Sequence, residues 1–131
     1  MKLYLAARYT RKDEIRGYAY YLTTEGFYTI TSTWFLEPHD PAVTLAEVTP
    51  ANLQEYAHRD LAEIDAADAL LLFSESDQTW NKRGGRHVEY GYALAKGKRI
   101  FVVGPHENIF HYVQGVTHFD TLDDFVKKGR G

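Results

Sequence analysis

Glu89 is the residue whose surroundings most clearly suggest chemistry. It follows a turn that contains Gly84 and Gly85 between two cations, Arg83 and Arg86, and it belongs to a short helical pattern. Glycines let the backbone approach a ligand closely, and the free N–H groups of a helix start attract anions. We expect Glu89 in the first turn of this helix, where the helix dipole keeps a carboxylate ionised. An acidic residue at that position can equally serve only to stabilise its helix.

A second group of carboxylates lies in the segment HRDLAEIDAAD. Asp60 falls in the middle of a predicted helix, and Asp65 and Asp68 flank the helix end, where the helix dipole disfavours acids. Turn formation accounts for Asp68. A mid-helix acid is commonly a solvated surface residue, so the spacing alone leaves Asp60 either a surface acid or a functional one.

Composition and missing motifs exclude several classes of protein. The chain has 131 residues, 44% hydrophobic and 25% charged, which suits a single compact domain over residues 1–131. A net charge of −3 without a basic block argues against nucleic-acid binding.

The sequence has no cysteine, which excludes disulfides and thiolate sites. It also lacks the Walker A, dinucleotide-binding, nucleophile-elbow and zincin motifs. Its six histidines have no metal-binding spacing, so we expect no metal and no organic cofactor.

The sequence also bears on the compartment. No apolar run approaches the roughly 20 residues that span a bilayer. The N-terminal segment MKLYLAARYT is too short in its apolar part, and too soon charged, for a signal peptide. We therefore expect a soluble, cytoplasmic protein that does not bind membranes.

Strand and helix patterns alternate along the chain. Strands are predicted at 2–7, 27–35, 69–73, 99–104 and 116–119, and helices at 11–26, 51–68, 86–96 and 121–129. This alternation predicts an α/β domain of three layers, flavodoxin-like (Rossmann-like), with a mostly parallel five-stranded sheet and helices on both faces. Such sheets bind ligands at the carboxyl ends of their strands, here segments 7–11, 34–50, 74–87 and 104–112. Residues 36–50 are either a variable insertion or a lid over the site.

The predicted helices each carry an apolar face. In the segment 11–26 this face consists of Ile15, Tyr18, Ala19 and Leu22, and in the segment 51–68 it consists of Leu53, Ala57, Leu61 and Ile64. We expect both faces to pack against the sheet.

Two stretches, HRDLAEIDAADALLLF and GGRHVEYGYALAKGKRIFVVG, together resemble the nucleoside 2-deoxyribosyltransferase superfamily, which includes the 2'-deoxynucleoside 5'-monophosphate N-glycosidases. The shared pattern is a helical Asp (Asp60), an I-x-x-A-D helix exit (64–68), an apolar strand (69–73), a Gly-rich turn, and E-x-G-x-A-x-x-x-G-K (89–98). The opening KLYLAARYT and the helix after it fit the first βα unit of that family. The resemblance covers residues 2–104.

The resemblance implies that Glu89 is the nucleophile that attacks C1' of a sugar, and that Asp60 orients the substrate or assists the departing base. The chemistry is consistent with this assignment. Cleaving an N-glycosidic bond builds positive charge on the sugar ring, which a nearby carboxylate stabilises or captures, and a second acid can protonate the base. Because family members commonly complete their sites by pairing subunits, the resemblance also implies a homo-oligomer.

Further residues are predicted to contact the substrate. Arg8 places a cation at the carboxyl end of the first strand, where family members often have a more Gly-rich turn. With the Gly84–Gly85 turn and Arg86, it predicts a site for an anionic group such as a 5'-phosphate. Arg8 can alternatively form only a surface salt bridge. Tyr9 is expected to line the pocket, and Asn108 to contact the substrate.

The sequence therefore predicts an enzyme that cleaves or exchanges the N-glycosidic bond of a (deoxy)nucleoside or nucleoside 5'-monophosphate, with a 2'-deoxy-5'-monophosphate as the preferred substrate. Two alternatives stay open. A non-catalytic nucleotide-binding or sensing domain would keep the glycine turn and the arginines but make little use of the two acids. A glycohydrolase would act on NAD or a related signalling nucleotide. Neither the base nor the choice between hydrolysis and transfer follows from the sequence.

Overall fold

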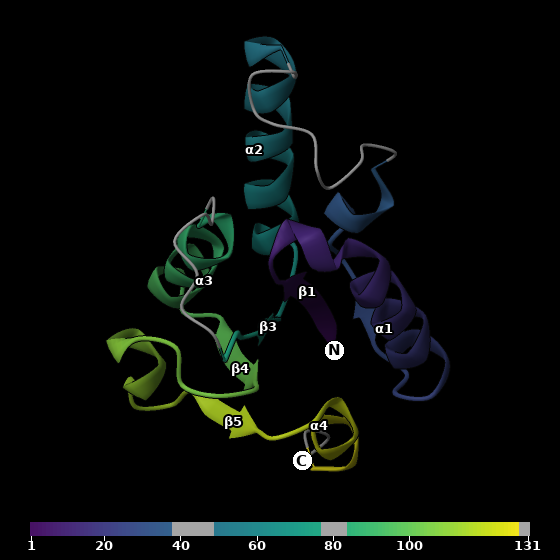
Figure 1. The fold of residues 1–131 in the computed structure, drawn as a ribbon, viewed down its shortest axis with the longest axis vertical. Coiled ribbons are helices and arrows are strands. Elements are labelled where there is room, and N and C mark those ends of the chain that lie inside the picture. The colour runs from purple at the N-terminus through teal and green to yellow at the C-terminus, as the bar shows by residue number, and fades with distance from the viewer. Residues whose placement is uncertain (38–48, 77–83, 129–131) are drawn as a thin grey trace.

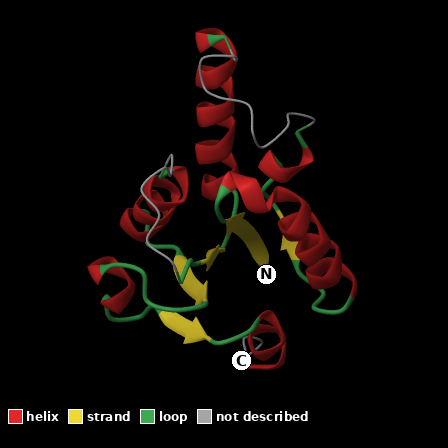
Figure 2. Ribbon diagram, viewed as in Figure 1, coloured by secondary structure: helices red, strands yellow, loops and turns green. Residues whose placement is uncertain are grey.

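A five-stranded parallel sheet in the order β2-β1-β3-β4-β5 forms the centre of the molecule in the computed structural model (Figures 1 and 2). The structure describes residues 1–37, 49–76 and 84–128. The strands are β1 (Lys2–Ala6), β2 (Thr29–Ile30), β3 (Ala69–Phe73), β4 (Arg99–Val103) and β5 (Thr117–Phe119). Since flavodoxin-like sheets have this strand order, the predicted fold class is confirmed.

Helices cover both faces of the sheet (Figure 1). They are α1 (Lys12–Thr24), α2 (Pro50–Asp65), α3 (Gly85–Ala95) and α4 (Leu122–Lys128). On one face, the Tyr21 hydroxyl of α1 donates to Asp123 of α4 at 2.7 Å. On the other face, the Tyr92 hydroxyl of α3 donates to Asp65 of α2 at 2.8 Å. The α2–α3 layer therefore lies opposite the α1–α4 layer.

The register of the sheet decides which side chains of β1 face the α2–α3 layer. Leu5 pairs with Leu71, and Leu71 pairs with Phe101 of β4. The Phe101 ring lies 5.1 Å from the ring of Phe125 in α4, so this row of side chains faces the α1–α4 layer. Because successive side chains of a strand point to opposite faces, Tyr4 points toward α2 and α3.

The second strand departs from the prediction. The segment 27–35 was expected to be one strand, but β2 spans only Thr29–Ile30, and Trp34–Leu36 form a short 3₁₀ helix, η2. The indole N–H of Trp34 donates to the Leu5 carbonyl at 2.7 Å, and Trp34 and Phe35 are both buried. The chain turns inward here because burying two aromatic side chains is worth more than extending an edge strand.

The two predicted apolar faces pack differently. In α1, Ile15, Ala19 and Leu22 are buried, as predicted, and Tyr18 is half-buried. In α2, Ile64 is buried and Leu61 half-buried, whereas Ala57 is exposed. Figure 1 shows the N-terminal part of α2 extending beyond the other described elements. The covered, C-terminal end of α2 is the part that carries Asp60. Most of the predicted insertion or lid at 36–50 lies outside the described residues.

Two short 3₁₀ helices border the carboxyl ends of the strands. They are η1 (Tyr9–Arg11), which follows β1, and η4 (Ile109–Tyr112), which lies in the predicted loop after β4. None of the helices in the described part of the chain is long and apolar enough to cross a membrane.

Gly104, directly after β4, has a φ of 117°, and an added Cβ would lie 2.5 Å from the Ser74 hydroxyl oxygen. We expect Gly104→Ala to lower the free energy of unfolding by about 1–3 kcal/mol, measured by urea denaturation, because both the backbone strain and the close contact oppose a side chain. Gly17→Ala in α1 is the matched control. Among the described residues, nothing lies within 4 Å of an added Cβ there, so this change should stabilise the helix by about 0.5–1 kcal/mol. Equal effects of the two substitutions would contradict the prediction.

Candidate active site

Glu89 of α3 and Tyr4 of β1 form the centre of the candidate site. Tyr4 is fully buried, and its hydroxyl donates a hydrogen bond to Glu89 Oε2. Glu89 is half-buried and lies on the side of α3 that carries the buried residues Arg86, Tyr90 and Ala93. The carboxylate is therefore held between the helix and the sheet and does not extend into bulk solvent.

The environment of Glu89 favours its neutral form. Burial, followed by the negative charges of Asp60 and Glu63, raises the pKa of Glu89 to about 8, although the hydrogen bond from Tyr4 and the charge of Arg59 oppose the rise. The expectation that a helix start keeps Glu89 ionised is wrong. Helix α3 begins at Gly85, so Glu89 lies in the second turn, beyond the main reach of the helix dipole. Desolvation then decides the direction of the shift.

Asp60 lies near enough for its charge to raise the pKa of both Tyr4 and Glu89. Its side chain is 23% exposed, and Oδ1 accepts two hydrogen bonds from Arg59, at 3.1 Å from Nε and 2.8 Å from Nη2. Burial is the main cause that raises the pKa of Asp60, and the Arg59 guanidinium opposes it. The fold thus brings together the two acids that the sequence singled out, from α2 and α3.

Arg59 also connects Asp60 to the predicted pocket residue Tyr9. Its guanidinium pairs with Glu37 as well as with Asp60. The Tyr9 hydroxyl lies 3.5 Å from the other carboxylate oxygen of Glu37, and the Tyr9 ring packs against Trp34 with centroids 6.1 Å apart. Tyr9 therefore lies on the Asp60 side of the site, and its contact with substrate stays a prediction.

Glu63 is an acid to which the sequence analysis assigned no role. It lies three residues after Asp60 in α2, and its carboxylate accepts hydrogen bonds from the Thr33 backbone N–H at 2.9 Å and the Thr33 hydroxyl at 2.6 Å. Its backbone carbonyl accepts from the Thr31 hydroxyl at 2.9 Å. These bonds attach the covered end of α2 to the segment after β2, which fixes the position of Asp60.

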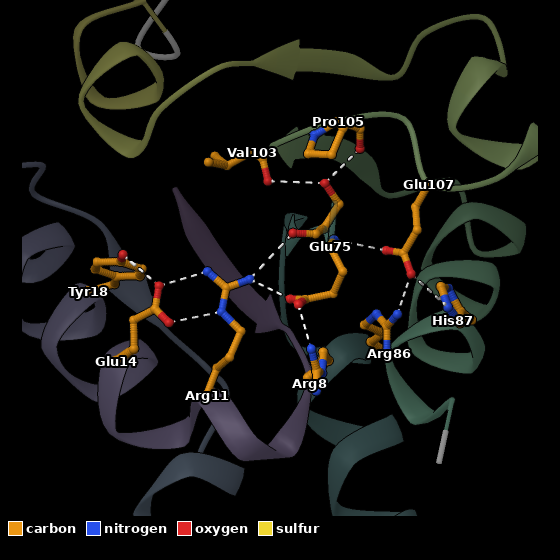
Figure 3. A network of polar contacts seen from close by, with 11 residues as sticks. Arg8, Arg11, Glu14, Tyr18, Glu75, Arg86, His87, Val103, Pro105 and Glu107 are labelled. Carbon is orange, nitrogen blue, oxygen red and sulfur yellow. Dashed lines mark hydrogen bonds and ion pairs between the residues drawn. The ribbon is translucent and has the colours of Figure 1, made fainter. Parts of the chain in front are cut away.

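The arginines that were predicted to hold a phosphate are bound by carboxylates of the chain itself (Figure 3). Arg8, after β1, donates to Glu75 at 2.8 Å, and Arg11 donates to the other oxygen of Glu75 at 2.7 Å. Arg86, near the start of α3, is 5% exposed and pairs with Glu107. The cations lie at the carboxyl edge of the sheet, as expected, and each is balanced by an acid.

Asn108 and His87 border this network. The His87 ring lies 3.4 Å from Glu107, and the Asn108 side-chain nitrogen lies 3.5 Å from His87 Nδ1. The side-chain oxygen of Asn108 accepts from the Phe110 N–H at 2.9 Å and so caps η4. This capping role accounts for Asn108, and its predicted contact with substrate stays a prediction.

The glycine turn has the expected geometry. Gly84 immediately precedes α3 with a φ of 76°, a left-handed conformation that favours glycine, and Gly85 is the first helical residue. Among the described residues, nothing lies within 4 Å of a Cβ added at either position. The described residues therefore leave space beside the backbone at the start of α3, and its predicted contact with a ligand stays a prediction.

Histidines gather on the side of the molecule near η4. The rings of His106 and His118 stack with centroids 3.7 Å apart. His111 is 1% exposed, and burial is the main cause that lowers its pKa to about 4. In the part of the chain that the structure describes, no group of three or more His, Asp or Glu side chains could hold a metal ion.

The sequence analysis also assigned no role to Tyr4, Glu75 and Glu107. A tyrosine within the otherwise aliphatic segment KLYLAA was the available signal for Tyr4, since a buried hydroxyl needs a partner. Glu75 and Glu107 lie within 74–87 and 104–112, the segments marked as ligand-binding ends of strands. Their pairing with Arg8 and Arg86 depends on the sheet order, which brings together residues far apart in the sequence.

The Tyr4 hydroxyl favours the ionised form of Glu89 by donating a hydrogen bond to it. We expect Tyr4→Phe to raise the pKa of Glu89 further above its ordinary value, as followed by carbon-13 NMR of the side-chain carboxyl carbon. Tyr92→Phe is the control because it removes another tyrosine–carboxylate hydrogen bond of α3, the one to Asp65. It should leave the pKa of Glu89 unchanged. A pKa of Glu89 that stays the same or falls in Tyr4→Phe would contradict the assigned role of the hydroxyl.

Comparisons with known proteins support the fold. The sequence matches no family model, and it matches no curated protein. Among solved structures, the chain is similar to the CMP N-glycosidase BcmB from Clostridium botulinum, with a TM-score of 0.59 and 19% sequence identity. The match covers 99% of this chain and 98% of that chain. A likeness at this identity shows the fold alone, and it extends over the whole of both chains.

Proposed function

We propose that this protein cleaves the N-glycosidic bond of a nucleoside or nucleotide, with Glu89 as the nucleophile. The observation that carries the proposal is the half-buried carboxylate of Glu89, hydrogen-bonded by buried Tyr4 and close to the charge of Asp60. Perturbed pKa values of paired acids are typical of catalytic sites. The likeness in fold to a structure named as a CMP N-glycosidase adds support.

In the first step, a Glu89 carboxylate oxygen attacks C1' of the sugar as the bond to the base breaks. Positive charge develops on the sugar ring, and the carboxylate stabilises it and then forms a glycosyl ester. Tyr4 donates to Oε2, which holds the carboxylate in one orientation and leaves Oε1 to react. Desolvation makes the ionised carboxylate a stronger nucleophile than it would be in water.

The departing base requires a proton, which we assign to Asp60. Burial raises the pKa of both acids, and the charge of Asp60 raises the pKa of Glu89 further, to about 8. The pair therefore disfavours ionisation of both acids and keeps one proton, as in other enzymes that use paired carboxylates. In the free protein this proton lies mainly on Glu89, so the reactive form, with Glu89 ionised and the proton on Asp60, is the minor one. Arg59 binds Oδ1 of Asp60 through both of its hydrogen bonds, so Oδ2 remains to donate the proton.

The glycosyl ester is then resolved by an acceptor. Water would release the free sugar, and a second base would form a new nucleoside. Either acceptor attacks C1' while Asp60, now ionised, takes up its proton. We keep both outcomes in the proposal, and the predicted homo-oligomer stays a prediction.

The purified protein should release free base from at least one member of a panel of nucleosides, nucleoside 5'-monophosphates and NAD. Glu89→Gln should lower kcat roughly 10³-fold or more, because the amide cannot form the ester. Glu55→Gln, on an exposed position of α2, is the control and should keep the activity. Base release is followed by chromatography, and addition of a second free base distinguishes exchange from hydrolysis. Ligand binding with no turnover of any substrate would overturn the proposal in favour of a sensing domain.

The pH dependence offers an independent test. Since the reactive pair holds one proton, kcat/KM should fall as the pH rises through the pKa of Glu89, about 8 in the free protein, because the pair then loses its last proton. In Tyr4→Phe this falling limb should move to higher pH, because the hydrogen bond that lowers the pKa of Glu89 is gone. The Tyr92→Phe profile should overlay that of the wild type. A wild-type kcat/KM that keeps rising as the pH passes this value would refute the assignment.

A further inference from the structure

The arginines that a substrate phosphate would use are already bound by two carboxylates. Arg8 and Arg11 both donate to Glu75, at 2.8 and 2.7 Å. The backbone N–H of Glu75 donates to one oxygen of Glu107 at 3.1 Å, and Arg86 pairs with the other oxygen. Glu75 and Glu107 thus take the acceptor positions that phosphate oxygens would occupy, as Figure 3 shows for the carboxyl edge of the sheet.

These ion pairs are shielded from solvent. The side chains of Glu75, Glu107 and Arg86 are 10%, 12% and 5% exposed. Breaking a shielded pair leaves an uncompensated charge, which is far more costly than breaking an exposed one. To pair with these arginines, a phosphate must displace the carboxylate of Glu75 or Glu107. Among the described residues, the one other basic side chain beside these two carboxylates in Figure 3 is His87, next to Glu107.

Among the described residues, this cluster also has no excess positive charge. Three arginines face three carboxylates: Arg8, Arg11 and Arg86 against Glu14, Glu75 and Glu107. His87 is the further titratable group beside Glu107, and burial lowers its pKa, which favours the neutral ring. A phosphate monoester carries a charge of about −1.5 to −2 at neutral pH, so it would add negative charge to a cluster that is already balanced.

This cluster lies within reach of a sugar bound at Glu89. Arg86 precedes Glu89 by three residues in α3, and both lie on its covered side, so their Cβ atoms are about 5–6 Å apart. A sugar with C1' against Glu89 would have Arg86 and its partner Glu107 within reach on one side. We assign the 5' carbon to this side, which faces the carboxyl edge of the sheet.

We propose that Glu75 and Glu107 are specificity-determining residues that exclude a 5'-phosphate, so that the substrate is a nucleoside with a free 5'-hydroxyl. The proposal rests on the glycosidase function proposed above, and it replaces the preference for a monophosphate. A hydroxyl donates to a carboxylate oxygen and accepts one N–H. The Nε of Arg86 is buried and has no hydrogen-bond partner among the described residues, so it lacks an acceptor that a bound hydroxyl would supply on reaching it. The substrate class would then differ from the one in the name of BcmB, a CMP N-glycosidase.

The first experiment compares matched substrates on the wild-type protein. For each base, kcat/KM for base release is measured with a nucleoside and with its own 5'-monophosphate. The nucleoside should be favoured by roughly tenfold or more, the discrimination expected when a charged group cannot be paired. A preference for monophosphates would overturn this inference and leave the glycosidase function standing. No base release from either class would overturn both.

The second experiment removes the excluding charges. Glu107→Gln and Glu75→Gln keep the side-chain size, release the arginines, and should each raise the ratio of monophosphate to nucleoside kcat/KM by roughly 10- to 100-fold. Glu55→Gln removes the same charge from an exposed site and should leave the ratio unchanged. Inorganic phosphate should inhibit nucleoside cleavage by Glu107→Gln and not by the wild type. Unchanged ratios in both variants would overturn the inference, and the wild-type comparison decides the matter if neither variant folds.

Discussion

A carboxylate taken out of water and held by one hydroxyl is the interaction on which the candidate site depends. Glu89 lies between α3 and the sheet, where Tyr4 of β1 donates to it and the charges of Asp60 and Glu63 oppose its ionisation. Such a group is costly to keep charged, and a fold retains it only where surrounding groups hold its position. The sheet register meets this requirement, because it turns Tyr4 toward the α2–α3 layer while Leu5 packs on the other side. The position of Glu89 near Asp60 therefore depends both on the placement of α3 and on the register of β1.

The layer above Glu89 is organised by hydrogen bonds rather than by an extensive apolar interface. In α2, Ile64 is buried near the C-terminal end, while the Ala57 side chain is exposed. Polar contacts compensate for this small apolar contact of α2. Glu63 accepts two hydrogen bonds from Thr33, and the Tyr92 hydroxyl of α3 donates to Asp65. These directional contacts fix the last turns of α2, and Asp60 lies within them. The end of α2 that carries Asp60 is thus linked by polar contacts both to the segment after β2 and to α3.

The local sequence was enough to predict most of the fold, but only part of the candidate site. Alternating apolar strands and amphipathic helices predicted the parallel sheet, and the E-x-G-x-A pattern pointed to Glu89. The ionisation state of Glu89 could not be predicted from its place in a helix, because it depends on burial by α2 and on Asp60, far away in the sequence. The same holds for Arg8 and Arg86, whose partners Glu75 and Glu107 follow other strands. At 27–35, β-branched and aromatic residues predicted one strand. The strand ends at Ile30 instead, because the chain then forms a 3₁₀ helix that buries Trp34 and Phe35.

The charged side chains at the carboxyl edge of the sheet form two groups that differ in how their charges are balanced. The arginines of the edge are matched with carboxylates, whereas Glu89 and Asp60 share Arg59 as the cation that opposes their raised pKa values. This difference has a physical consequence for glycosidic chemistry. A transition state with positive charge on the sugar is stabilised by negative potential and opposed by nearby unpaired cations. Were Arg86 unpaired, its full charge would act one helical turn from Glu89 and would hold that carboxylate ionised but less able to stabilise a cationic sugar. Pairing Arg86 with Glu107 cancels this field locally, so the carboxylate pair can dominate the potential where the sugar would bind.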